Sequence, residues 1–139
     1  MRIALATVGI LVALYTSSVR ADDYRDATDA AYCIGVLQAN IDIWKGWSPD
    51  VQSKIAATMR YAEQKKFRKE AFVEGAIKQA KLDGATASKM TSVGLADANL
   101  YVQSVRDCYH SDLAGEQRAN CLKRTEPLHD RIENCEMRE

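Results

Sequence analysis

The stretch AAYCIGVLQANIDIWKGW, residues 30–47, decides the fold of this chain. Its apolar residues recur at spacings of three and four, which predicts a helix with a wide apolar face. One row consists of Ala30, Ile34, Leu37, Ile41 and Trp44, and an adjacent, mostly apolar row consists of Cys33, Val36, Asn40, Ile43 and Trp47. The other side carries small residues, among them Gly35 and Ala39, which would allow another backbone to come close. We therefore predict the central helix of an all-α domain.

Residues 1–21 have the pattern of a cleaved secretory signal peptide. A short positively charged start precedes the apolar run Ile3–Leu14, and Ala21 ends a cleavage site of small residues. The run is shorter than the roughly 18 residues that a membrane span needs, so we expect no stable membrane anchor. Cleavage would leave residues 22–139 as a single helical domain. We expect the protein to be exported, to the periplasm or outside the cell.

The composition restricts both the partners and the redox environment. Lys and Arg together number 19, as do Asp and Glu, and such a balance gives no long-range field to attract nucleic acid or an anionic membrane. All cysteines follow the signal peptide: Cys33, Cys108, Cys121 and Cys135. An even number of cysteines behind an export signal predicts two disulfides, with three possible pairings.

Further helices follow the central one. Ser48-Pro49-Asp50 is a strong helix start and predicts a long second helix, Pro49–Asp83. Its apolar stripe changes phase, so we expect a bend or break near residues 64–75, with Gly75 as the weak point. A third helix, capped by Thr86 or Ser88, would end near His110.

The C-terminal part predicts two short helices, Glu116–Arg124 and one that follows Pro127. No stretch alternates apolar and polar residues as a strand does. The predicted architecture is a small helical bundle of three main helices plus a short C-terminal helical hairpin, stapled by disulfides.

Helix lengths suggest which cysteines pair. At about 1.5 Å per residue, the second helix would descend about 50 Å and the third would climb about 32 Å to Cys108. Those lengths bring Cys108 level with Cys33. We therefore favour Cys33–Cys108 with Cys121–Cys135, and the two other connectivities stay open.

Catalytic and cofactor motifs are missing from the sequence. It has no Cys-x-x-Cys-His haem motif, no glycine-rich phosphate loop and no Gly-x-Ser-x-Gly, so we expect no cofactor and no enzyme. His110 and His129, with Cys108, Cys121 and Cys135, offer metal ligands. Their spacing lacks the paired pattern of zinc sites, and thiols form disulfides in an oxidising compartment.

Two groups of residues are candidates for an interaction surface. The first is EQKKFRKE, residues 63–70, in which Phe67 would anchor a docking patch with Lys65, Lys66, Arg68 and Lys69. We favour the alternative, a solvated helix face with Phe67 turned into a local core. The second is Trp44 with Trp47, which would line a ligand pocket or, as we favour, cap the end of the bundle core.

These patterns predict a non-catalytic binding or interaction module with another protein as its partner, of the inhibitor, immunity or stress-protective type. The alternative is a metal- or small-ligand-binding protein that uses the C-terminal Cys and His residues or an aromatic pocket. The partner and the oligomeric state stay open.

Overall fold

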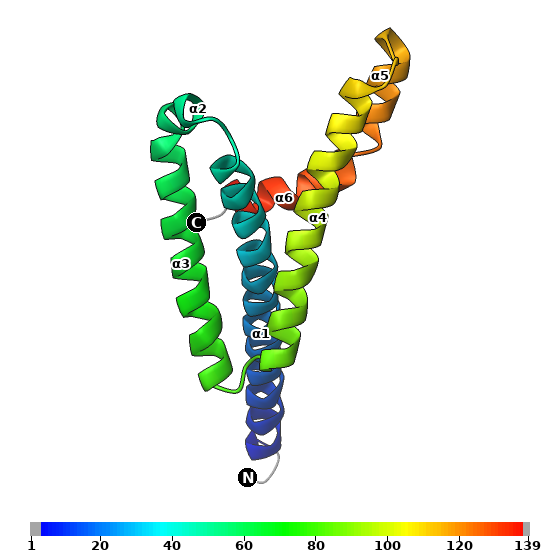
Figure 1. Cartoon of the computed structure of the whole chain (residues 1–139). Coiled ribbons are helices and arrows are strands. Elements are labelled where there is room, and N and C mark those ends of the chain that lie inside the picture. The colour runs from blue at the N-terminus through cyan, green and yellow to red at the C-terminus, as the bar shows by residue number, and fades with distance from the viewer. Residues whose placement is uncertain (1–3, 138–139) are drawn as a thin grey trace.

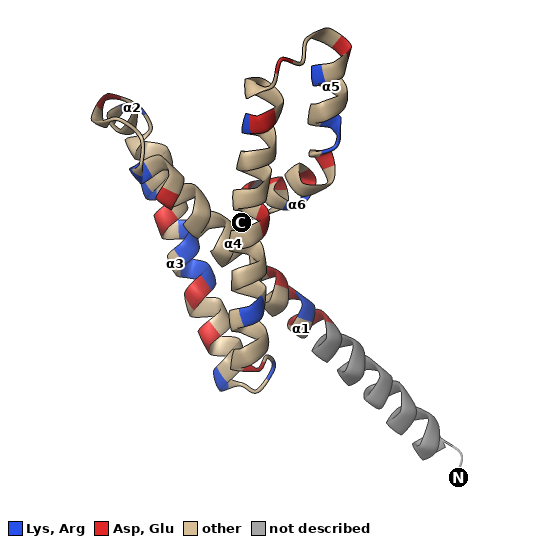
Figure 2. Cartoon of the chain, turned by 45° about the vertical axis from the view of Figure 1, so that its right-hand side comes forward, with Lys and Arg blue, Asp and Glu red and all other residues tan. Residues whose placement is uncertain are grey.

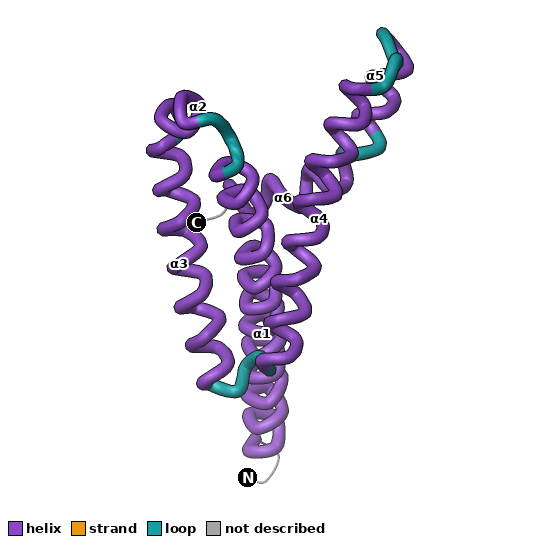
Figure 3. Tube along the Cα trace, viewed as in Figure 1, coloured by secondary structure: helices purple, strands orange, loops and turns teal. Residues whose placement is uncertain are grey.

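The computed structural model describes residues 4–137, and the side chains of residues 22–136 (Figure 1). In that part of the chain helices follow one another without a strand (Figure 3). They are α1 (Ala4–Lys45), α2 (Pro49–Lys54), α3 (Ala56–Lys78), α4 (Gly84–His110), α5 (Gly115–Lys123) and α6 (Glu126–Met137). The all-α prediction is therefore confirmed. The predicted signal peptide and its cleavage after Ala21 lie outside the residues whose side chains are described.

The prediction of a central helix is confirmed by α1, which packs against α3, α4 and α6 (Figure 1). The first apolar row packs on α3: Ile34 belongs to a core cluster with Val73, and Leu37 to another with Ala62. The second row packs on α4 and α6 through a cluster that contains Cys33 and Val36. No described helix combines the length and the apolar character that a bilayer crossing requires.

Two glycines bring α1 and α4 into backbone contact. A Cβ atom on Gly35 would lie 1.9 Å from the carbonyl oxygen of Thr91, and one on Gly94 would lie 2.0 Å from that of Tyr32. Across the same contact, the Thr91 hydroxyl donates a 3.0 Å hydrogen bond to the carbonyl of Ala31. The expected close approach on the small-residue side of α1 is confirmed at Gly35.

The predicted second helix differs from the structure. The chain breaks at Ile55, between α2 and α3, and α3 then runs without interruption through residues 64–75. The apolar stripe does not fail there, because Lys65 is only 6% exposed and Lys69 is half-buried. Their aliphatic stems continue the buried face between Ala62 and Val73. The predicted break near Gly75 is therefore wrong.

The start of the next helix also differs. Helix α3 ends at Lys78, and Ala80 turns the chain with a φ of 54°. The side chain of Asp83 then caps α4 by accepting a 2.8 Å hydrogen bond from the backbone N–H of Thr86. The expected caps, Thr86 and Ser88, are wrong because Asp83 precedes them with the acceptor that the first turn needs.

The two disulfides join Cys33 to Cys135 and Cys108 to Cys121. The favoured pairing is therefore wrong. At 23 residues, α3 descends only about 34 Å, so α4 begins higher along α1 than expected. Gly94 already lies beside Tyr32, and Cys108 lies about 21 Å further along α4.

The real pairing changes the C-terminal arrangement. The α4–α5 hairpin, closed by Cys108–Cys121, projects from the bundle, and α6 returns to α1 (Figure 1). The expected hairpin of the last two short helices, closed by Cys121–Cys135, does not form. Both disulfides suggest an oxidising environment.

The glycine contact predicts the effect of a single methyl group. Gly35→Ala or Gly94→Ala would place a Cβ against backbone that cannot rotate away, so each should lower the free energy of unfolding by about 3 kcal/mol or more. Urea unfolding followed by circular dichroism measures this. Gly75→Ala is the matched control, since its Cβ meets nothing within 4 Å and should stabilise α3 by about 0.5–1 kcal/mol. Equal effects at all three positions would contradict the backbone contact.

The two disulfides should contribute unequally to the free energy of unfolding. Cys33–Cys135 spans 102 residues and its removal with C33A/C135A should cost about 4.7 kcal/mol in the chain-entropy model. Cys108–Cys121 spans 13 residues, and C108A/C121A should cost about 3 kcal/mol. Thermal and urea unfolding of both variants test the order. Peptide mapping that joins Cys33 to Cys108 would overturn the arrangement.

Candidate functional site

A groove of 560 Å³ lies between α1, α3 and α6, and we call it the α1–α3–α6 groove. Its volume falls within the range of sites that hold small ligands. Its lining consists of Asp26, Asp29, Ala30, Tyr32, Cys33, Tyr61, Lys65, Arg68, Lys69, Phe72, Met90, Arg131, Asn134 and Cys135. Figure 2 shows that both signs of charge occur along the described part of α1 and along α3.

The floor of the groove is one face of α1. Asp26, Asp29, Ala30 and Cys33 share this face because helical neighbours recur every three or four residues. The disulfide of Cys33 fixes α6 at the upper end of this face. Asp26 and Asp29, further towards the N-terminus, stay exposed.

One wall is a single stripe of α3. Tyr61, Lys65, Arg68 and Phe72 follow each other at helical spacing, with Lys69 beside them. Tyr61 and Phe72 occupy the two ends of the stripe and are about half exposed. Cations therefore stand between two aromatic rings along this wall.

Lys65 lies where the groove wall of α3 meets α6. Its ammonium donates a hydrogen bond to the carbonyl oxygen of Glu136, in the last turn of α6. It also lies 5.6 Å from the centre of the Tyr61 ring. The C-terminal end of a helix carries partial negative charge, so the buried ammonium is stabilised there. Lys65 thus joins α3 to α6 and is not free for a ligand.

The groove is also lined by four other charged side chains, Asp26, Asp29, Arg68 and Lys69. Lys69 is half-buried, and burial together with repulsion by Lys65 lowers the pKa of its ammonium below the ordinary value. Arg68 lies beside it on the same wall. Among the described residues, none forms an ion pair or side-chain hydrogen bond with Arg68, Lys69, Asp26 or Asp29.

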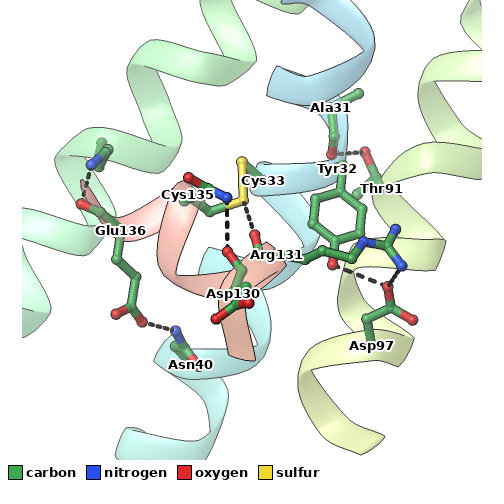
Figure 4. Close-up of a disulfide and its surroundings, with 12 residues drawn as sticks. Ala31, Tyr32, Cys33, Asn40, Thr91, Asp97, Asp130, Arg131, Cys135 and Glu136 are labelled. Atoms are coloured by element: carbon green, nitrogen blue, oxygen red, sulfur yellow. Dashed lines mark hydrogen bonds and ion pairs between the residues drawn. A yellow bond between two sulfur atoms is a disulfide. The ribbon is translucent and has the colours of Figure 1, made fainter. Parts of the chain in front are cut away.

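A network of Tyr32, Asp97 and Arg131 holds α1, α4 and α6 together next to the groove (Figure 4). The Tyr32 hydroxyl donates a 3.0 Å hydrogen bond to Asp97, and Arg131 approaches the same carboxylate oxygen at 3.2 Å. The guanidinium of Arg131 also lies 5.1 Å from the centre of the Tyr32 ring. Burial and the Asp97 carboxylate raise the pKa of Tyr32 to about 12. Arg131 is therefore committed to the fold although it lines the groove.

The segment EQKKFRKE is divided between two sides of α3. Lys65, Arg68 and Lys69 line the groove, whereas Lys66 pairs with Glu70 at 2.7 Å. Phe67 is 70% exposed, so the favoured local core around it is wrong. An open hollow of 350 Å³ contains Phe67 with Glu63, Gln64 and Arg68.

The two tryptophans lie away from the groove. Trp44 packs against the cluster of Leu37, Ile41 and Ala62, which confirms its predicted role at the end of the core. Trp47 is 43% exposed, so the same prediction is wrong for it. Neither lines the α1–α3–α6 groove.

The alternative metal site loses its sulfur ligands, because Cys108, Cys121 and Cys135 are all bonded in disulfides. The ligand atoms of His129, Asp130 and Glu133 lie within 4.8 Å of one another. All three side chains are exposed, and such groups are common on helix surfaces without an ion.

Sequence reasoning did not find most of the groove. The stripe Tyr61, Lys65, Arg68 and Phe72 was detectable from its helical spacing. No local signal identified Asp97, because its partners belong to other helices.

Comparisons of the chain with protein-family models, with curated proteins and with solved structures found no match. Function is therefore inferred from the groove and from the residues that line it.

The Tyr32 network predicts a dependence of stability on high pH. An unfolded tyrosine ionises near pH 10, whereas folded Tyr32 keeps its proton to about pH 12. The unfolded state loses the proton first, so the free energy of unfolding should fall between these values, by up to about 2 kcal/mol. Tyr32→Phe should flatten this fall in urea titrations. Tyr24→Phe, at an exposed position of α1, keeps Tyr32 and should show the same fall as wild type. If the free energy of unfolding fell equally with pH in both variants, the network would be contradicted.

Proposed function

We propose that this protein is an exported, non-catalytic binding module that holds its ligand in the α1–α3–α6 groove. The observation that carries the proposal is the groove itself, 560 Å³ in volume, with partly apolar walls and charged side chains that have no partner within the described chain. Pockets that bind small ligands combine an apolar lining with a few polar groups in the same way.

The lining residues favour binding over chemistry. They include no histidine, serine or threonine, and both lining cysteines are bonded to each other. Nucleophilic catalysis needs an activated hydroxyl, thiol or amine beside a base. Of the two amines in the lining, Lys65 is hydrogen-bonded to Glu136, and no base among the described residues contacts Lys69. The charged groups of the groove are therefore assigned to recognition.

The size of the groove favours a small ligand or a short segment. A stable protein–protein interface buries about 800 Å² on each partner, far more than a pocket of this volume offers. The sequence predicts another protein as the partner. A groove of this size would accept only a small group of such a protein.

Export supports the same function. The pattern of residues 1–21 and the two disulfides together favour a compartment outside the cytoplasm. Cys33–Cys135 fixes one end of the groove before a ligand arrives. Such preorganisation lowers the entropy cost of binding.

Blocking the groove tests the proposal. The oxidised protein would be incubated with a protein-free nutrient broth, and retained compounds would be measured by native mass spectrometry. Wild type should retain at least one compound that Asp29→Trp does not, because the indole would occupy the floor of the groove. Asp42→Trp, at an exposed position of α1 outside the groove, should bind like wild type. If wild type retains nothing, or if Asp29→Trp retains the same compounds, the proposal is wrong.

A further inference from the structure

The charges that are free to meet a ligand lie on two sides of the groove. Lys65 is bonded to Glu136 and Arg131 is paired with Asp97, so each already has a partner within the protein. That leaves two acidic side chains on α1 and two basic ones on α3. They are Asp26 and Asp29 on the floor, and Arg68 and Lys69 on the wall.

Each pair concentrates one sign of charge. Asp26 and Asp29 lie three residues apart on α1, one turn of helix, and both are exposed. Arg68 and Lys69 are neighbours on α3, and Lys69 already feels the repulsion of Lys65. A negative group of a ligand would relieve that repulsion, and a positive group would do the same for the two carboxylates.

The surface between the charges is apolar. Ala30 and the Cys33–Cys135 disulfide lie on or above the floor, and the ring of Phe72 is half exposed at one end of the wall. Met90 reaches the groove from α4. An aromatic or aliphatic side chain of a ligand would bury this surface.

We propose that the groove binds a short free peptide with an apolar side chain, a ligand class that rests on the proposed function. The α-ammonium group would lie at Asp26 and Asp29 and the terminal carboxylate at Arg68 and Lys69. The apolar side chain would cover Phe72 and the neighbouring surface.

Ligands with a single sign of charge fit less well. An anion would meet Asp26 and Asp29, and a cation would meet Arg68 and Lys69, so each would be repelled on one side. A neutral ligand would desolvate both pairs without giving either of them a partner.

Capped dipeptides provide the test. Leucyl-phenylalanine would be titrated into the full oxidised protein by calorimetry, together with its N-acetyl form, its C-terminal amide and the form with both caps. The free dipeptide should bind, and each cap should weaken binding about tenfold, because it removes a hydrogen-bonded charge. Both caps together should weaken binding further.

Two charge-neutralising variants assign the two ends. Asp26→Asn with Asp29→Asn should abolish the penalty of N-acetylation and keep that of amidation. Arg68→Gln with Lys69→Gln should do the reverse. Circular dichroism and thiol alkylation would verify that both variants fold and keep their disulfides.

The outcomes separate this inference from the proposed function. Equal binding of all four peptides, no binding of the free dipeptide, or equal changes of both penalties in both variants would overturn the peptide proposal. The binding function would still stand if wild type retained a broth compound that Asp29→Trp excludes. The binding function would be wrong only if the broth experiment gave the opposite result.

Discussion

The contact between α1 and α4 through Gly35 and Gly94 determines how the rest of the molecule is arranged. Backbone contact at this point lets Thr91 reach the carbonyl of Ala31 and sets the position of α4 along α1. Since α1 meets α4 closely on its small-residue side, its first apolar row stays available for α3, and its second row packs on both α4 and α6. One helix therefore supports three neighbours, and the groove is the part of its surface that they leave open.

Helix α6 packs on this arrangement and is attached to each of the three long helices. Its disulfide to Cys33, its ion pair with Asp97 and its hydrogen bond with Lys65 attach it to α1, α4 and α3 in turn. Asn40 adds a 2.8 Å hydrogen bond to the Glu136 side chain. The short helix α6, which buries Ile132 and Cys135 in the core, is thus positioned by several specific interactions. The same interactions give Lys65 and Arg131, both in the lining of the groove, partners within the protein.

Periodicity predicted the central helix and its close approach at Gly35, because both are local properties of residues 30–47. It failed at lysine, whose side chain has an aliphatic stem and a charged end. The stems of Lys65 and Lys69 continue the apolar stripe, although both residues count as polar in the sequence. The cysteine pairing depended on the length of α3, which the unexpected break at Ile55 shortened. The groove was not predictable, because its charges resemble any solvated helix surface until packing separates bonded from unbonded groups.

The nested order of the disulfides has a consequence for how the chain matures. A chain that emerges from its N-terminus presents Cys33 first, and then Cys108, Cys121 and finally Cys135. Oxidation in order of appearance would join Cys33 to Cys108, whereas the native bridge closes around the smaller one. Correct maturation therefore requires that Cys33 stays reduced until Cys135 is available, or that an early bridge is exchanged. The native partner of Cys33 thus lies on α6, the last of the described helices to be synthesised.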